Sequence, residues 1–296
     1  MIHTLDLRFQ GIEHAIAAFA VETSVGLVLI ETGPHSTFPY LEKGIQSIND
    51  QHEIGTVLLS HIHLDHAGAA WAMAEKGSTI YMHPFGVKHM VDPSKLMESA
   101  TRIYGDMMDT LWGQMKNIPE EKIHATSHLE EVAVGDQTFV ALHTPGHAKH
   151  HIAWELDDII FCGDVAGVKI GGGPVVAPCP PPDIDIEGWK SSIQLLRERK
   201  PSKLLLTHFG TIEKAAIPSH LDELEMILDD WAGWIKTRWE AGEDMAKMTE
   251  DFSQYTAQQL IDKGVSSSGL KQYEAANPAW MSVAGLVRYW KNKTTN

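Results

Sequence analysis

The sequence predicts an α/β protein in which short strands and helices alternate along the chain. Apolar runs of four to seven residues end in polar or glycine-containing turns, and such runs rich in Val, Ile and Leu are typical of buried strands. Helical patterns lie between several of these runs, as in layered α/β domains. The 296 residues, of which 43% are hydrophobic and 21% charged, have the composition of a globular protein.

Seven runs are predicted to form strands, and helices are predicted between some of them. The predicted strands are residues 15–21, 25–30, 56–59, 79–82, 138–142, 159–162 and 203–206. One helix is expected at 38–48, after the Gly33-Pro34 turn, and another at the small, apolar segment 68–76. A third helix is expected at 186–199, because Pro201 cannot continue it.

Two segments depart from this alternation. Residues 84–117 lack a strand pattern and carry methionines and aromatics at mixed helical spacings, so we expect a helical insertion there. From Pro218 onward the chain is expected to be helical, with Ser219 as the N-cap of the first helix. Its apolar face repeats every three or four residues through Leu221, Leu224, Leu228, Trp231 and Ile235.

We therefore predict a domain over residues 1–217 and a helical C-terminal extension over 218–296. The last helix of the extension is expected to start at Asn277-Pro278, with asparagine capping and proline in the first turn. Loops and appended elements are not needed to build the layers of the domain. We therefore expect the insertion and the extension to cover the edge of the domain that carries the functional site, and to set its substrate specificity.

Charge and composition exclude several classes of partner. The formal net charge of −15 would repel a nucleic-acid backbone, so we expect no nucleic-acid partner. Two cysteines, Cys162 and Cys179, exclude a disulfide framework. The apolar run 15–21 is too short for a membrane span and lacks the preceding basic segment of a signal peptide. These features predict a cytoplasmic protein with a small-molecule substrate and no membrane partner; a homo-oligomer stays open.

The segment Ser60-His61-Ile62-His63-Leu64-Asp65-His66 directly follows a predicted strand. Packed imidazoles without a shared cation would leave donors unpaired and would repel one another when protonated. In an extended loop His61 and His63 point the same way. Asp65 and His66 lie where the chain turns into the next helix and can address a second cation. The segment therefore predicts a metal site.

Three further candidate ligands occupy the same position relative to a strand. His147 follows the strand at 138–142, Asp164 the strand at 159–162, and His208 the strand at 203–206. Strand ends converge on one edge of a layered α/β domain, where ligands bind. The seven side chains make two sites if Asp164 bridges them. Imidazole and carboxylate ligands without thiolate favour two zinc ions and also suit iron or manganese.

The His-x-His-x-Asp-His segment, the Thr144-Pro145-Gly146-His147 turn, Gly163-Asp164 and Thr207-His208 together resemble the metallo-β-lactamase superfamily over about residues 1–215. The full ligand set is similar to that of its glyoxalase II-type hydrolases. The resemblance implies a four-layered αβ/βα sandwich with a dinuclear site at one edge. Where the family usually has Asp-Thr-Gly, this chain has Glu31-Thr32-Gly33, so Glu31 is expected to support the site.

The resemblance leaves the substrate open. Lactonases of the superfamily usually carry a tyrosine shortly after the bridging aspartate. This chain has Gly167 and Val168 there, which argues against a lactonase. Lactamases of the best-known zinc group have a cysteine at the position of Asp164, and RNA-processing members fit poorly with the acidic charge. His83, at a strand end, and the pair His150 and His151, just after His147, are further candidates for supporting or substrate contacts.

The predicted function is a metal-dependent hydrolase that uses a metal-bridged hydroxide on an ester, thioester, lactone or phosphoester. Asp65 is expected to act both as a ligand and as the catalytic proton acceptor. The alternative is an oxidoreductase similar to persulfide dioxygenases, which keep a single iron on a His-His-Asp face. The presence of Asp65, His66 and His208 argues against that alternative, and His63 argues against flavodiiron-type members, which have glutamate there.

Overall fold

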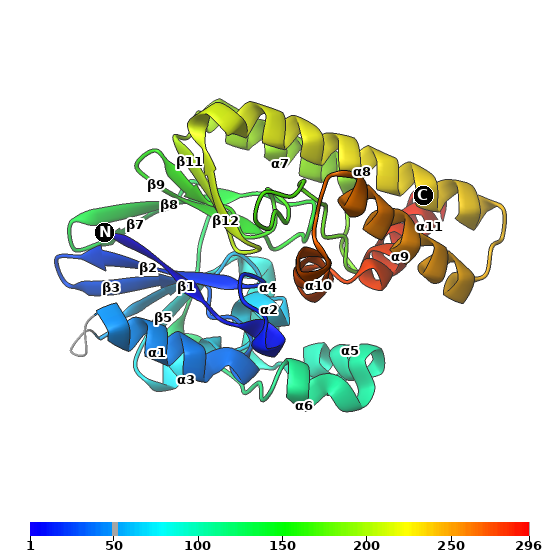
Figure 1. Cartoon of the computed structure of the whole chain (residues 1–296). Helices are drawn as coiled ribbons and strands as arrows, with labels where there is room; N and C mark the ends of the chain where they lie inside the picture. Colours follow the sequence, from blue (N-terminus) through cyan, green and yellow to red (C-terminus); the bar gives the residue numbers. More distant parts are fainter. Residues whose placement is uncertain (49–52, 296) are drawn as a thin grey trace.

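The computed structural model describes residues 1–48 and 53–295. Two six-stranded sheets face each other, and helices cover their outer faces (Figure 1). The α/β class and the four-layered sandwich predicted from the sequence are confirmed.

The first sheet runs in chain order across its width. Its strands are β1 (Ile2–Asp6), β2 (Ala17–Thr23), β3 (Gly26–Ile30), β4 (Thr56–Leu58), β5 (Thr79–Met82) and β6 (Ile123–Ala125). The pairs from β3 to β6 are parallel, so each needs a crossover connection. The helices in the first two crossovers are α1 (Phe38–Ile48), α2 (Leu64–Ala67) and α3 (Ala70–Glu75).

The second sheet has the order β12-β11-β10-β9-β8-β7. Its strands are β7 (Glu131–Val134), β8 (Gln137–His143), β9 (Ile152–Leu156), β10 (Ile159–Phe161), β11 (Lys203–Leu206) and β12 (Gly210–Glu213). Only the β10–β11 pair is parallel, and α7 (Ile186–Arg199) supplies its crossover. The helix α7 has the predicted bounds.

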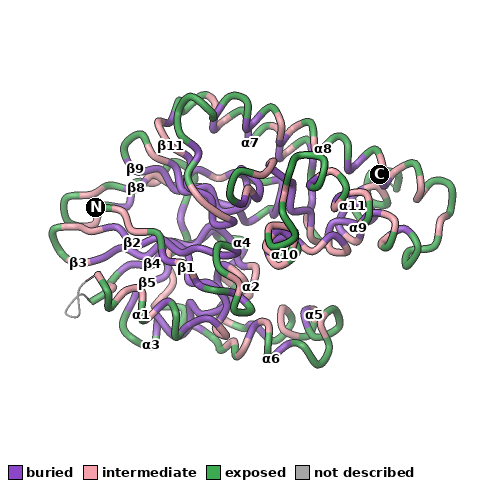
Figure 2. The backbone as a smooth tube through the Cα atoms, viewed as in Figure 1, coloured by how far each residue is buried: buried purple, intermediate pink, exposed green. Residues whose placement is uncertain are grey.

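Aromatic side chains fill the space between the two sheets. Phe19 of the first sheet packs on Phe161 of the second, with ring centroids 5.3 Å apart. Trp154 is fully buried in the same layer, and its indole N–H donates to the Leu59 carbonyl at 3.0 Å. Figure 2 shows the buried residues concentrated along the strands. These contacts fix the two sheets against each other and hence the relative positions of the loops at their edges.

The predicted insertion is helical. It contains α4 (Pro84–Val91), α5 (Ser94–Tyr104), the short turn η3 (Gly105–Met107) and α6 (Met108–Leu111). The buried residues Met90, Ala100 and Met108 belong to the apolar cluster that covers the outer face of the first sheet. The remaining short 3₁₀ segments are η1 (Phe9–Gly11), η2 (His35–Thr37), η4 (Glu120–Lys122) and η5 (Lys214–Ala216).

The C-terminal part consists of α8 (Ile217–Glu240), α9 (Met245–Asp262), α10 (Ser267–Ala276) and α11 (Ala279–Thr295). The predicted apolar face of α8 is confirmed, because all five of its residues are buried. They belong to the same apolar cluster as β10 and β11, so the extension packs directly on the second sheet. None of the described helices combines the length and the apolar character needed to cross a membrane.

The prediction for the start of α8 is wrong in one respect. The turn η5 leads straight into α8, so Ala216 is the residue before the helix and Ser219 already lies inside its first turn. The Ser219 hydroxyl donates to the Ala216 carbonyl at 3.1 Å. The sequence analysis also missed five strands, namely β1, β6, β7, β9 and β12.

Candidate metal centre

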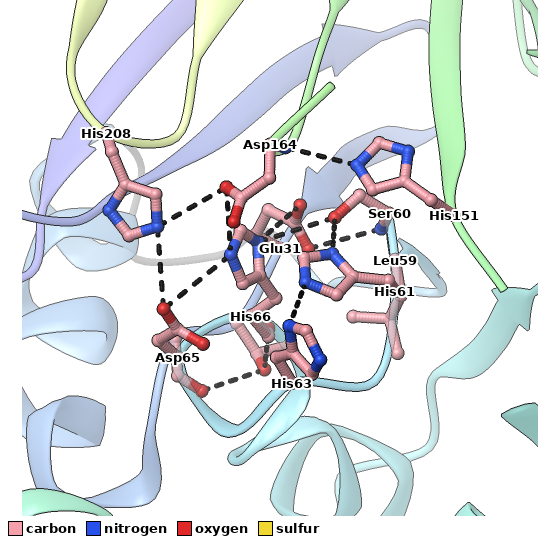
Figure 3. A network of polar contacts seen from close by, with 12 residues as sticks. Glu31, Leu59, Ser60, His61, His63, Asp65, His66, His151, Asp164 and His208 are labelled. Atoms are coloured by element: carbon pink, nitrogen blue, oxygen red, sulfur yellow. Dashed lines mark hydrogen bonds and ion pairs between the residues drawn. The ribbon is translucent and has the colours of Figure 1, made fainter. Parts of the chain in front are cut away.

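The predicted metal ligands all follow strands and meet at one edge of the sandwich. Figure 3 labels each of them except His147. The segment between β4 and α3 supplies four of them, two in the loop and two on α2. The second sheet supplies one ligand after each of three strands, β8, β10 and β11. Their ligand atoms form three overlapping groups within 4.8 Å: His61, His63 and His147; His61, His66 and Asp164; and Asp65, His66 and His208. We call these seven side chains the metal cluster.

Three histidines form one side of the metal cluster. Nδ1 of His63 lies 2.8 Å from Nε2 of His61 and 3.1 Å from Nε2 of His147. Three ring nitrogens therefore face a common point, although His61 and His63 present different ring nitrogens to it. Such a facial set of three imidazoles leaves further coordination positions for water and substrate.

Asp164 lies between this side and the other. Its Oδ2 is 3.2 Å from Nε2 of His147, and its Oδ1 is 3.3 Å from Nε2 of His66 and 3.4 Å from Nε2 of His208. Oδ2 of Asp65 lies 3.4 Å from that nitrogen of His208 and completes the second side. The two oxygens of Asp164 thus face the two sides, which is the arrangement of a bridging carboxylate.

Contacts behind the rings fix which nitrogen each histidine offers. Nδ1–H of His147 donates to the Pro178 carbonyl and Nδ1–H of His208 to the Ala15 carbonyl, each at 2.8 Å. Both rings therefore present Nε2 to the centre of the cluster. Donation of the second ring N–H to a carbonyl or carboxylate is the usual way in which proteins orient metal-binding histidines.

Glu31 performs this supporting role for His66. Its Oε1 accepts from Nδ1–H of His66 at 3.1 Å, and its Oε2 accepts from the backbone N–H of Ser60 at 3.3 Å. Glu31 is fully buried, and its φ of 64° lies in the left-handed region that non-glycine residues rarely adopt. The sequence analysis did not single out Ser60 as a site residue, yet its hydroxyl lies 2.8 Å from Nδ1 of His61.

Several buried ligand atoms lack hydrogen-bond partners. Among the described side chains these include Nε2 of His66, Nε2 of His208 and Oδ1 of Asp164. Buried polar atoms are nearly always paired, because an unsatisfied group loses its interaction with water without compensation. Divalent cations coordinated by these atoms would supply the missing interactions. The nitrogen and oxygen donors fit zinc, iron or manganese.

Charge states differ between the two sides of the cluster. Burial lowers the pKa of His61 and lowers that of His63 to about 3, so both imidazoles are neutral at pH 7. Burial opposes ionisation of Asp65, but the positive charges of His66 and His208 outweigh it and lower the pKa of Asp65 to about 2. The charges of Asp164 and Asp65 outweigh burial at His66 and His208 and raise the pKa of both rings. Because metals coordinate neutral imidazoles and ionised carboxylates, metal binding would release a proton from each of these two rings.

The other predicted candidates lie at different distances from the cluster. Nε2 of His151 accepts from the backbone N–H of Asp164 at 3.1 Å, so this histidine holds the backbone of Asp164. The ring of His150 lies 5.9 Å from that of His63. The ring of His83 instead lies 4.2 Å from that of His143 at the end of β8, and its Nδ1 accepts the Phe85 N–H at the start of α4, so these contacts are with β8 and the insertion.

A cavity of about 1500 Å³ opens onto the metal cluster and reaches His63, Asp65 and Asp164. Much of the rest of its lining comes from the insertion, α4 to α6, and from α8 to α11, in agreement with the prediction that these segments cover the metal edge. Residues of the segments 9–12 and 176–183 also line it. Tyr104 of the insertion packs edge-on against Trp280 of α11, with ring centroids 5.7 Å apart. Burial raises the pKa of Tyr104, and the negative charge of Asp65 acts in the same direction.

Comparison with known proteins agrees with this geometry. The sequence model of the metallo-beta-lactamase superfamily matches residues 12–208. The chain therefore belongs to this superfamily. The matched segment contains all seven side chains of the metal cluster.

Two curated relatives and one solved structure illustrate the relationship. The metallo-beta-lactamase fold-containing protein ST1585 of Sulfurisphaera tokodaii is 30% identical over 57% of this chain and 65% of its own length. The beta-lactamase-like protein 2 homolog of Drosophila melanogaster is 25% identical over 63% of this chain and 56% of its own. The chain thus matches less than two thirds of the length of these relatives.

The solved structure is that of the metallo-beta-lactamase family protein TTHA1429 of Thermus thermophilus. It superposes with a TM-score of 0.68 at 16% identity and covers 99% of this chain, while this chain covers 94% of it. At this identity the similarity concerns the fold. Because nearly the whole chain is covered, the similarity includes the helical C-terminal part.

Proposed function

We propose that the protein is a dinuclear metal-dependent hydrolase, similar to the glyoxalase II-type members of its superfamily. The observation that carries the proposal is the pair of ligand sets that share Asp164. The buried Nε2 atoms of His66 and His208, which have no hydrogen-bond partner in the described structure, lie on one side of this residue, and three converging histidines lie on the other. A single cation would leave one of these two sets unsatisfied.

Two divalent cations, with zinc as the preferred metal, would supply an acidified water and polarise the bond that breaks. The carboxylate of Asp65 is ionised and lines the cavity, so it can accept the proton of the attacking water. Hydroxide oxygen then bonds to the acyl carbon or phosphorus, and the bond to the leaving oxygen or sulfur breaks. The proton held by Asp65 passes to the leaving group.

The small-molecule substrate is proposed to be an ester, thioester, lactone or phosphoester. The test is a panel of these four classes, assayed with zinc-loaded protein in the absence of oxygen. Hydrolysis of at least one class supports the proposal. Activity that requires both oxygen and iron, together with inactivity of the zinc form, would instead support a persulfide-dioxygenase-like reaction, because zinc has no accessible second oxidation state.

A further inference from the structure

The cavity above the metal cluster has an apolar region that is open to water. Phe85, Ile103 and Met107 line the cavity, yet they are 60%, 41% and 50% exposed. Tyr104, Trp112 and Trp280 extend this surface between the insertion and α11, and their rings contact one another in sequence. Exposed apolar surface that is concentrated in one concave site is typical of ligand-binding sites.

The charge of the cavity is opposite to that of the whole chain. The chain has 24 basic and 39 acidic residues. The cavity lining has five lysine or arginine side chains, but outside the metal cluster it has only two carboxylates, Asp183 and Glu274. An excess of positive charge inside a cleft of an acidic protein attracts an anionic ligand.

Three of these lysines, Lys88 of α4, Lys95 of α5 and Lys149, line the cavity together with His89. Burial and the charges of all three lower the pKa of His89, while Asp183 acts in the opposite direction. Lys149 is paired with Asp183 at 3.0 Å. Lys88 and Lys95 form no ion pair with any carboxylate in the part of the chain that the structure describes. We call Lys88, Lys95 and Lys149 the basic end.

The helix α5 connects the basic end with the aromatic side chains of Tyr104, Trp112 and Trp280. Lys95 lies in its first turn and Tyr104 is its last residue, so the rise of an α-helix sets them about 14 Å apart along the axis. The basic end and these aromatic side chains line the same cavity, which also reaches His63, Asp65 and Asp164 of the metal cluster. The ring of His150, which follows Lys149, lies 5.9 Å from that of His63, and Tyr104 lines the same cavity as Asp65. A substrate spanning the cavity would therefore have its reacting centre between an anionic and an apolar part.

We propose, building on the proposed hydrolase function, that the substrate is an ester or thioester with an extended apolar acyl chain and an anionic group on its leaving part. The acyl chain lies along Ile103, Met107 and Trp280. The anion lies at the basic end, and the carbonyl carbon lies at the metal cluster. Hydrolysis releases a fatty carboxylate and an anionic alcohol or thiol.

The experiment compares four thioesters in a matched set: hexanoyl and dodecanoyl chains, each on pantetheine and on phosphopantetheine, which differ only by the phosphate. We expect kcat/KM to be highest for dodecanoyl-phosphopantetheine. The longer chain is expected to raise kcat/KM at least about tenfold, because each added methylene is removed from water. Equal rates for both chain lengths and for both leaving groups would overturn the proposal.

Two variants locate the parts of the substrate. The double variant Lys88→Gln/Lys95→Gln is expected to raise KM roughly five- to tenfold for the phosphopantetheine thioesters and to leave the pantetheine thioesters unchanged. Met107→Gln is expected to raise KM several-fold for dodecanoyl but not for hexanoyl substrates. Lys291→Gln and Met226→Gln are the matched controls, because both side chains are exposed and lie outside the cavity. Variants that affect all four substrates equally would contradict the assignment.

A binding measurement separates this inference from the hydrolase proposal. The probe is the thioether analogue of dodecanoyl-phosphopantetheine, which cannot be hydrolysed, and its binding is followed by tryptophan fluorescence. Binding that weakens in the lysine double variant, in a protein that hydrolyses none of the thioesters, would support the ligand class and refute the hydrolysis. Hydrolysis without any dependence on chain or phosphate would support the hydrolase and refute the ligand class.

Discussion

The metal cluster and the cavity walls above it differ in how firmly their side chains are held. His66, His147 and His208 are almost fully buried, and each has a hydrogen-bond partner behind its ring. By contrast, Phe85 and Met107 in the cavity walls are 60% and 50% exposed, and their apolar side chains form no hydrogen bonds in the described structure. Fixed groups preserve reaction geometry, whereas walls of this kind can be altered without disturbing the chemistry. The difference predicts that substitutions in the cluster change kcat and metal content, and substitutions in the walls change KM.

The largest effect is expected from removing a ligand of the second side. His208→Ala deletes the nitrogen that faces both Asp65 and Asp164. Metal content, measured on protein purified without chelator, should fall from close to two ions per chain toward one, and hydrolysis should fall to background. His124→Ala, at an exposed histidine paired with Glu130, serves as the control. A wild-type protein that never binds more than one ion under metal-replete conditions would refute the dinuclear centre.

Asp65→Asn is expected to separate catalysis from metal binding. An amide can still coordinate weakly through its oxygen, but it cannot accept the proton of the attacking water. Loss of a general base typically costs about 10²- to 10⁴-fold in rate, so kcat should fall by that factor while metal content falls much less. Metal analysis and kinetics on the same preparation provide the comparison. Parallel losses in both quantities would show that Asp65 serves only in assembling the site.

Glu31→Gln tests the support behind the ligands. The charged partner of His66 is replaced by a neutral amide of the same length, so the ring stays in place but its nitrogen becomes a weaker ligand. Loss of such a partner typically costs roughly 10- to 100-fold in metal affinity or activity. Glu131→Gln, at an exposed position of β7, is the control. An unchanged metal affinity would mean that Glu31 stabilises only the backbone around Ser60.

The two regions also differ in how far the sequence predicts them. The four candidate ligands from His61 to His66 were predictable because they are concentrated in six positions after a strand. His147, Asp164 and His208 are isolated in the sequence, and only their common position after strands, together with the family resemblance, pointed to them. The carbonyls of Ala15 and Pro178 that orient the rings were not predictable, because any residue type offers a backbone carbonyl.

Tertiary contacts explain the elements that the sequence analysis missed. The strand β9 contains Glu155, a poor strand residue by composition, but Arg199 of α7 binds its carboxylate through two hydrogen bonds. The cap predicted at Ser219 failed because η5 continues into α8, a feature that depends on how β12 ends. The cavity walls have apolar residues at mixed spacings, so the sequence predicted helices there without predicting which faces would meet.

The smallest effect is expected at the boundary between the two regions, at Tyr104. Its hydroxyl contacts the sulfur of Met281 at 3.7 Å, and burial keeps the phenol protonated by raising its pKa. If the cavity walls select the substrate and take no part in the reaction, Tyr104→Phe should change kcat by less than about twofold, since it removes only one weak hydrogen bond. Tyr104→Ala, which removes the ring, should raise KM for long apolar substrates. A tenfold or larger fall in kcat for Tyr104→Phe would place the phenol at the reacting centre. The cavity walls would then take part in the reaction, and the proposed division between a catalytic metal cluster and substrate-selecting walls would be wrong.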